Sequence, residues 1–236
     1  MRVLTLGWEL PPHFAGGAGI VSAALAESAS KSGHAVTYLM PSGPDSADDE
    51  RFQLIVASHH GAPMHLGRIT SGLQAYDGTR LTEELPGPAH TSSFAGPRRL
   101  YGPALLDEVA TFSEQAVAAI QETGLSFDVI HAHDWTTWPA GLALRQALGI
   151  PLVIHVHITE YDKTGDQSAD PAVLAIESEG MQRADRVIAV SRRIAQSCID
   201  RYGVAPEQIR VVYNALEPLG KARRRRHGKT VLFLVG

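Results

Sequence analysis

The 236-residue chain has one cysteine and no long apolar run, and each scarcity excludes a class of protein. A single cysteine, Cys198, cannot form an internal disulfide and is typical of a reducing cytosol. No stretch approaches the roughly 18–20 apolar residues of a membrane span, and the first apolar run, residues 3–6, is too short for a signal peptide. These features predict a cytoplasmic protein.

Excess charge of either sign is also absent. The 21 Lys and Arg residues and 25 Asp and Glu residues give a net charge of −4, which provides no overall attraction to nucleic acid or an anionic membrane. Hydrophobic residues make up 44% of the chain and aromatic residues only 6%. We therefore expect an aliphatic core, built from helices packed closely on a sheet.

Short β-rich apolar runs alternate with longer helical patterns, which is typical of a parallel sheet with crossover helices. The pattern predicts an α/β, Rossmann-like fold with a parallel sheet and helices on both of its faces. The predicted strands are Val3–Leu6, Ala35–Met40, Phe52–Ala57, Phe127–Ala132, Leu152–Val156, Arg186–Val190 and Ile209–Tyr213. The predicted helices are Ala18–Ser32, closed by Gly33, then Ala104–Glu122, Thr137–Leu148, Ala172–Ala184, and one capped by Ser191.

Three segments have weaker or different patterns. Residues 59–102 are rich in Gly, Pro, Ser and Thr and predict short strands and functional loops, and residues 157–171 predict a loop. Residues 216–229 include four consecutive arginines and predict a basic linker after an N-terminal domain of residues 1–215. Residues 230–236 then resemble the first strand of a second domain, and one strand cannot form a core by itself. We therefore expect the chain to lack most of a C-terminal domain.

The loop of residues 11–19 places several glycines between the first strand and a helix N-terminus. Backbone amides can approach an anion there, and ligands favour the carboxyl ends of parallel strands. A tight turn without a ligand is the alternative. A dinucleotide cofactor fits poorly, because Ser22 stands where the third glycine of G-x-G-x-x-G belongs and the second strand ends in Leu39-Met40-Pro41, without the acid that holds a ribose.

Two H-x-H pairs, at residues 131–133 and 155–157, lie at the ends of predicted strands. Residues i and i+2 of a strand share a face, so each pair could chelate a metal. The H-x-H-x-D-H motif of metallohydrolases is not matched, because Asp134 comes one place early and Thr136 is not a histidine. Packed polar residues are a second alternative. We favour polar residues that line a cleft, with no metal.

Three other features predict structural roles. Asp185 and Ser191 flank a strand and are typical of a turn and a helix cap. The arginines at 223–226 are typical of a solvated linker, since no stacking aromatic residues accompany them as in a nucleic-acid site.

Taken in order, several segments resemble the GT-B retaining glycosyltransferases, and within them the glycogen and starch synthase-like group. The matching segments are residues 8–12, 16–17, 100–102, 108–109, 127–135, 151–165, 176–177, 184–185, 190–191 and 211–214. The resemblance implies a two-domain enzyme that transfers a hexosyl group, expected to be glucosyl, from UDP-glucose or ADP-glucose to a sugar or glucan acceptor with retention. It implies no cofactor. This chain would be the acceptor-binding half, inactive without the C-terminal domain.

The resemblance also implies roles for individual residues. Gly16 and Gly17 would lie near the donor phosphates. The catalytic residues would be Asp134, in the sugar cleft, and His157, against the transferred sugar near its reacting carbon. The other expected substrate-binding residues are His133, Trp135, Glu160 and Lys163.

Two positions depart from the family pattern. Phe14 and Ala15 fill the stretch where bacterial starch synthases carry a lysine, which leaves the donor open, and Ala215 replaces a usual glycine. Two alternatives of other classes also stay open at this stage: a metal-dependent hydrolase that uses the H-x-H pairs, and a non-catalytic sugar-binding module.

Overall fold

The computed structural model describes residues 1–11, 16–42, 51–59 and 105–215. Within them, parallel strands form one sheet in the order β3-β2-β1-β4-β5-β6-β7, which confirms the predicted α/β, Rossmann-like fold. The strands are β1 (Arg2–Leu6), β2 (Ala35–Met40), β3 (Gln53–Val56), β4 (Val129–His133), β5 (Leu152–Val156), β6 (Arg186–Ala189) and β7 (Ile209–Val211). The helices are α1 (Gly17–Lys31), α2 (Leu105–Thr123), α3 (Trp138–Leu148), α4 (Glu160–Thr164), α5 (Pro171–Arg183) and α6 (Arg192–Tyr202).

The strand order reverses at β1, which pairs with β2 on one side and with β4 on the other. Because the connections after β1 and β4 leave in opposite directions, a crevice is expected at the carboxyl ends of these two strands. This is the position where open α/β sheets bind ligands.

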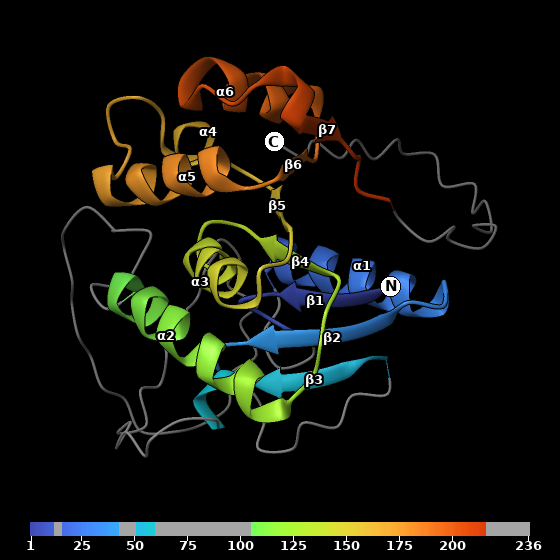
Figure 1. Ribbon diagram of the computed structural model, residues 1–236. Helices are drawn as coiled ribbons and strands as arrows, with labels where there is room; N and C mark the ends of the chain where they lie inside the picture. Colours follow the sequence, from blue (N-terminus) through green and yellow to red (C-terminus); the bar gives the residue numbers. More distant parts are fainter. Residues whose placement is uncertain (12–15, 43–50, 60–104, 216–236) are drawn as a thin grey trace, which may run out of the picture.

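Helices cover both faces of the sheet, as predicted. Figure 1 shows α1 behind the sheet and α2 and α3 in front of it, with α4 to α6 gathered around β5 to β7. Side chains alternate along a strand, so Val3 belongs to the buried cluster that includes Ala23 and Ala26 of α1. Its neighbour Leu4 belongs to the cluster that includes Phe112 of α2. The core is therefore two layers, one on each face.

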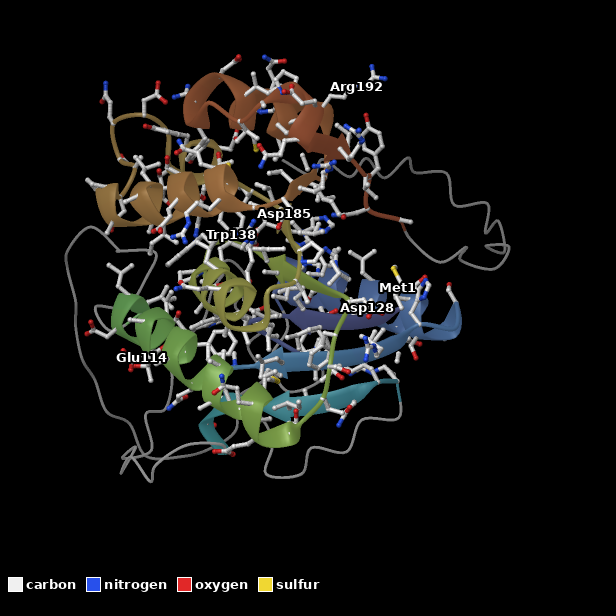
Figure 2. The ribbon with its side chains drawn as sticks, in the orientation of Figure 1. Met1, Glu114, Asp128, Trp138, Asp185 and Arg192 are labelled. Carbon is white, nitrogen blue, oxygen red and sulfur yellow. The ribbon has the colours of Figure 1, made fainter. Side chains whose placement is uncertain are left out.

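Two contacts fix α3 against its neighbours. Trp138 is fully buried against Gly180 of α5, where a Cβ atom would come within 2.7 Å of the indole ring. Figure 2 shows Trp138 on the side of α3 that faces α5. Asp185 accepts two hydrogen bonds from the Arg145 side chain, at 2.8 and 3.0 Å, and one from the Leu152 amide at 2.8 Å. Asp185 thus joins α3, β5 and the start of β6, which agrees with its predicted structural role.

Most predicted boundaries agree with the structure. The strands Ala35–Met40 and Leu152–Val156 have the predicted ends, and the other predicted elements in the described residues begin and end within two residues of the prediction. Gly33 is left-handed (φ 86°), and Ser191 caps α6 by accepting a hydrogen bond from the Ile194 amide at 3.1 Å. These local signals were sufficient because each acts within four residues of its position.

One prediction was wrong: the segment after β5 is not only a loop, because it contains α4. Thr159 caps this helix by accepting a hydrogen bond from the Asp162 amide at 3.2 Å. Five residues are too few to show a helical period, so the pattern gave no sign of it. The short strands expected between residues 60 and 102, the linker 216–229 and the strand 230–236 lie outside the described residues. Among the described helices, none is long and apolar enough to cross a membrane.

Candidate functional site

The end of β1 and the start of α1 are joined by a buried carboxylate. Glu9 is buried, and its Oε2 accepts a hydrogen bond from the backbone amide of Gly16, the N-cap residue of α1. A Cβ atom at Gly16 would come within 2.4 Å of that oxygen, and one at Gly19 within 2.7 Å of the Glu9 Cβ. Both glycines are therefore required by the approach of Glu9. Gly17 differs: it is exposed, and a Cβ atom there would meet nothing within 4 Å.

Tyr38 of β2 holds this carboxylate segment in place. Its hydroxyl donates to the Glu9 carbonyl at 2.9 Å and lies 2.8 Å from the Ser22 hydroxyl. Ser22 therefore has a structural partner at the position where a dinucleotide fingerprint would have glycine. Burial raises the pKa of Glu9, and the hydrogen bond from Gly16 opposes that rise. The negative carboxylate lies at the positive end of the α1 dipole, which stabilises it further.

Asp134 forms a turn that ties the end of β4 to the end of β5. Its backbone is left-handed (φ 57°), which is uncommon for a residue with a side chain and is concentrated at functional sites. The Asp134 amide donates to the His155 carbonyl at 3.0 Å, and its Oδ1 accepts from the His157 amide at 2.9 Å. Burial raises the pKa of Asp134 to about 7, against the opposing effects of the His157 amide and the charge of Lys163.

The histidines of the two H-x-H pairs come together on one face of β4 and β5. His133 and His155 are paired in the strand register, and residues two apart share a face. His131 Nε2 lies 3.2 Å from His155 Nδ1, and His133 Nδ1 lies 3.1 Å from His157 Nε2. The rings of His155 and His157 stack with centroids 4.6 Å apart. Each hydrogen-bonded pair joins one histidine of β4 to one from β5 or its end.

Burial keeps these imidazoles neutral. It lowers the pKa of His131 and His155 to about 3 and that of His157 to about 4, and it holds the pKa of His133 well below its usual value. The neighbouring imidazoles lower the pKa of all but His157 further. At neutral pH the cluster can hydrogen-bond a ligand hydroxyl but carries no charge.

Two glutamates lie side by side at the start of α4. Glu177 of α5 accepts hydrogen bonds from the Glu160 amide at 2.9 and 3.1 Å and another from the Tyr202 hydroxyl. Glu160 Oε1 accepts from the Asp170 amide at 3.1 Å, whereas Glu160 Oε2 is buried without a hydrogen-bond partner among the described residues. Burial raises the pKa of Glu177 to about 8. These contacts fix both the position and the orientation of Glu160.

These parts line one pocket at the carboxyl ends of β1, β4 and β5. Its lining includes five of the residues predicted from the sequence: His133, Asp134, Trp135, Glu160 and Lys163. The other predicted residues lie next to the pocket without lining it. Gly16 and Gly17 directly precede the lining residue Ala18, and the His157 ring is bonded to the lining residue His133. Sequence reasoning did not predict Glu9 and Glu177 as site residues, and it noted Ser22 only as a departure from the dinucleotide fingerprint, but all three also line the pocket. Glu9 and Glu177 fall in matched segments, but only their long-range contacts show what they do.

The histidine cluster is also the place where a metal-dependent hydrolase, the alternative function, would hold its metal ion. Ring nitrogens of His131, His133 and His155 lie within 4.8 Å of one another. We predict that the purified protein holds no stoichiometric transition metal, because the His131 and His155 nitrogens already bond to each other and no carboxylate of the described residues completes the set. Elemental mass spectrometry of protein purified without chelators is the measurement. One zinc per chain, lost in His131→Asn, would instead favour the hydrolase alternative.

A second prediction concerns stability against pH. Since the histidine pKa values are lowered on folding, their contribution to stability is complete above about pH 6.5 and is lost as the pH falls through about 4 and about 3. The raised pKa values of Asp134 and Glu177 have the opposite effect. The contribution of these two carboxyl groups to stability is complete at about pH 4 and is lost as the pH rises through 7 and 8. We therefore predict maximal stability near pH 6.5, with slopes of up to ~1.4 kcal/mol per pH unit for each group.

Urea unfolding between pH 5 and 8.5 measures this profile, and two variants separate its limbs. His155→Gln should flatten the acid limb and Glu177→Gln the alkaline limb. A wild-type profile without a maximum between pH 6 and 7 contradicts the prediction.

Comparison with known proteins shows the family to which this sequence belongs. Residues 15–218 match the model of Glycosyltransferase Family 4. The chain is 34% identical over 96 residues to D-inositol 3-phosphate glycosyltransferase 1 of Catenulispora acidiphila, a match that covers 39% of this chain and 23% of that protein. It is 25% identical over 244 residues to the glycogen synthase of Mycobacterium tuberculosis, covering all of this chain and 54% of the synthase.

Solved structures share the fold. Sucrose-phosphate synthase from Thermosynechococcus elongatus superposes with a TM-score of 0.58 at 19% identity, over 90% of this chain and 48% of that one. Anabaena HepE in complex with UDP-glucose has a TM-score of 0.52 at 16% identity, over 92% and 44%. The chain thus spans about half the length of these two proteins and of the glycogen synthase, and less of the D-inositol 3-phosphate glycosyltransferase. On the match over residues 15–218, the chain belongs to Glycosyltransferase Family 4.

Proposed function

We propose that the protein transfers a hexosyl group, specifically glucosyl, from UDP-glucose or ADP-glucose to a carbohydrate acceptor, with retention and without a metal. The observation that carries the proposal is the pocket where β1, β4 and β5 end, in which Asp134 and His133 meet Glu160 and Lys163. The glucosyl donor is supported by a glycogen synthase relative and by a structural neighbour that binds UDP-glucose. In the reaction, the bond from the anomeric carbon to the diphosphate breaks, an acceptor oxygen takes its place, and the acceptor proton leaves with the diphosphate.

The proposed division of function between two domains is supported by the coverage of the relatives, of which this chain spans about half. We assign residues 1–215 to acceptor binding, residues 216–229 to a linker and residues 230–236 to the first strand of a donor-binding domain. The basic groups that neutralise the leaving diphosphate would belong to that second domain, together with the amide of Gly17, beside which there is open space. A cytoplasmic location, expected from the single cysteine, stays a prediction.

The test of the function is a transfer assay on the full-length protein and on residues 1–236. We expect the full-length protein to move radiolabelled glucose from UDP-glucose or ADP-glucose to a carbohydrate acceptor, and residues 1–236 alone to give no product above a heat-killed control. Transfer by residues 1–236 alone would reject the division of labour. Failure of the full-length protein with every nucleotide-sugar would reject the function.

His157 is the proposed contact to the transferred sugar. Its backbone is fixed to Asp134, and its ring is neutral, half-buried and bonded to His133, a lining residue of the pocket. A neutral imidazole held in this way can bond a sugar hydroxyl and keep the ring in place as positive charge develops at the anomeric carbon. Because such positioning acts mainly in the transition state, its loss should appear in kcat more than in KM.

We predict that His157→Ala in the full-length protein lowers kcat by about 10²–10³-fold, as does the loss of other preorganised polar contacts. His155→Ala is the matched control: His155 is only 1% exposed, so we expect it to lower the melting temperature more than the rate. Steady-state transfer and thermal unfolding of both variants provide the measurement. A folded His157→Ala enzyme within a few-fold of wild type would show that the wrong histidine was chosen.

A further inference from the structure

His133 has one ring nitrogen that is bonded and one that is not. Its Nδ1 lies 3.1 Å from Nε2 of His157, while its own Nε2 is buried without a hydrogen-bond partner among the described residues. His133 lines the pocket and is only 3% exposed, whereas His157 lies beside the pocket and is half-buried. The two rings therefore form a bonded pair that runs from the pocket wall to a more exposed position next to it.

The pair holds a fixed number of ring protons. Burial lowers the pKa of His157 to about 4 and holds that of His133 well below its usual value, so both imidazoles are neutral at neutral pH. A neutral imidazole carries one ring proton, on Nδ1 or on Nε2. The hydrogen bond between the rings contains one of the two protons. The other proton therefore lies on one of the two outer nitrogens, which are Nε2 of His133 and Nδ1 of His157.

Only two arrangements satisfy this count, and in both the two rings share a tautomer. If His133 Nδ1 donates, both rings are protonated on Nδ1, so His157 Nδ1 is a donor and His133 Nε2 is a bare acceptor. If His157 Nε2 donates, both rings are protonated on Nε2, so His133 Nε2 is the donor and His157 Nδ1 the bare acceptor. The two outer nitrogens thus always have opposite character.

The second arrangement is the one that suits the proposed transfer. A sugar hydroxyl that donates a hydrogen bond becomes richer in electrons at its oxygen, and this stabilises positive charge that develops at the anomeric carbon. His157 Nδ1 must be bare to accept from such a hydroxyl, and among the described residues it has no other partner. His133 Nδ1 keeps it bare by accepting the proton of His157 Nε2. Hydrogen bonds that run in one direction through the pair also strengthen one another.

A neighbouring pair of histidines has the same chemistry outside the pocket. His131 Nε2 lies 3.2 Å from His155 Nδ1, and burial lowers the pKa of both residues to about 3, so the same proton count applies. Neither residue belongs to the described lining of the pocket. The pair of His131 and His155 is therefore an internal control for the pair that reaches the pocket.

We propose that His133 is a positioning residue for His157, and that the two imidazoles act as one donor–acceptor unit in which both rings are protonated on Nε2. His157 Nδ1 then accepts from a hydroxyl of the transferred sugar, and His133 Nε2 carries an N–H on the side of the pocket. An oxygen that accepts from this N–H stabilises the same arrangement, so ligand binding in the pocket and recognition of the transferred sugar are linked through one hydrogen bond. The inference rests on the proposed function and deepens it, because it gives His133 a role that acts through His157.

Nitrogen NMR on the full-length protein, labelled with 15N-histidine, determines the tautomers directly. The shifts and proton couplings of the ring nitrogens distinguish a protonated nitrogen from a bare one, and the His133→Asn and His157→Ala variants assign the signals. We expect both rings to be neutral at neutral pH and protonated on Nε2. Any other pattern overturns the proposal, whether both rings are protonated on Nδ1, the two rings differ, or either ring is charged.

Two substitutions of His133 separate the roles of its two nitrogens. The amide of Asn reaches about as far as Nδ1 of histidine, so His133→Asn keeps an acceptor for His157 and removes the nitrogen on the side of the pocket. The amide of Gln reaches about as far as Nε2, so His133→Gln keeps the outer polar group and removes the partner of His157. We expect kcat to stay within about threefold of wild type in His133→Asn and to fall about tenfold or more in His133→Gln, with KM changed less than kcat.

A double-mutant cycle tests whether His133 acts through His157. Because His157→Ala already removes the contact that His133 positions, adding His133→Gln to it should lower kcat no further. His131→Asn breaks the control pair, and we expect it to lower the melting temperature without changing the tautomer of His157. Thermal unfolding of each variant shows whether a lower rate reflects a folding defect, and the tautomers of the wild-type protein decide the matter where a variant does not fold.

The outcomes separate this inference from the proposed function. A loss of rate in His133→Gln that His133→Asn does not show and that His157→Ala masks supports the positioning role. Equal losses in the two His133 variants, or a further loss in the double variant, overturn that role and leave glycosyl transfer standing. A folded full-length protein that transfers no sugar from any nucleotide-sugar, yet has both rings protonated on Nε2, rejects the proposed function but supports the coupling of the two rings.

Discussion

The site depends on the turn at Asp134. A left-handed residue at the end of β4 directs its own amide to the His155 carbonyl and its carboxyl group to the His157 amide. Two neighbouring parallel strands are thereby joined at their carboxyl ends by side-chain and backbone contacts from one residue. The ring of His157 can reach His133 only because this turn sets the direction in which the chain leaves β5. The backbone strain of about 1–3 kcal/mol that such a conformation carries is offset by these hydrogen bonds.

The other side of the pocket is organised by Glu9. Its carboxylate takes the Gly16 amide at the start of α1, where the helix dipole and the free amides would otherwise attract an external anion. Gly16 and Gly19 are glycines because of this internal contact, and only Gly17 has open space beside it. A donor phosphate that approaches α1 is therefore expected to meet the Gly17 side of the loop. Gly16 and Gly17 are adjacent in the sequence, but the absence of a side chain has a different physical reason at each.

Much of the fold could be predicted from the sequence, because its signals are local. Strand period, the cap at Ser191 and the left-handed Gly33 each depend on a few adjacent residues, and the structure agrees with them. The resemblance to glycosyltransferases implied that His133 and Asp134 belong to the sugar-binding cleft, and both line the pocket at the strand ends. The sequence could not show α4, which is a single short turn of helix. It also could not show the contact of Glu177 with Glu160, because seventeen residues separate the two and no periodic pattern connects them.

The carboxyl groups of this chain are bonded differently at the two ends of the sheet. At the amino end of the sheet, Asp128 beside Arg2 is fully engaged, and at the start of β6 Asp185 has three donors. Figure 2 shows both acids away from the carboxyl ends of the strands, and both have lowered pKa values because of their arginine partners. At the carboxyl end, by contrast, Asp134 and Glu177 have raised pKa values, and Trp8 Nε1, His133 Nε2 and Glu160 Oε2 line one pocket without a hydrogen-bond partner in the described part of the chain. A fold that pairs its carboxylates with arginines elsewhere, yet leaves this end desolvated and incompletely bonded, is preorganised for a ligand that supplies the remaining hydrogen bonds.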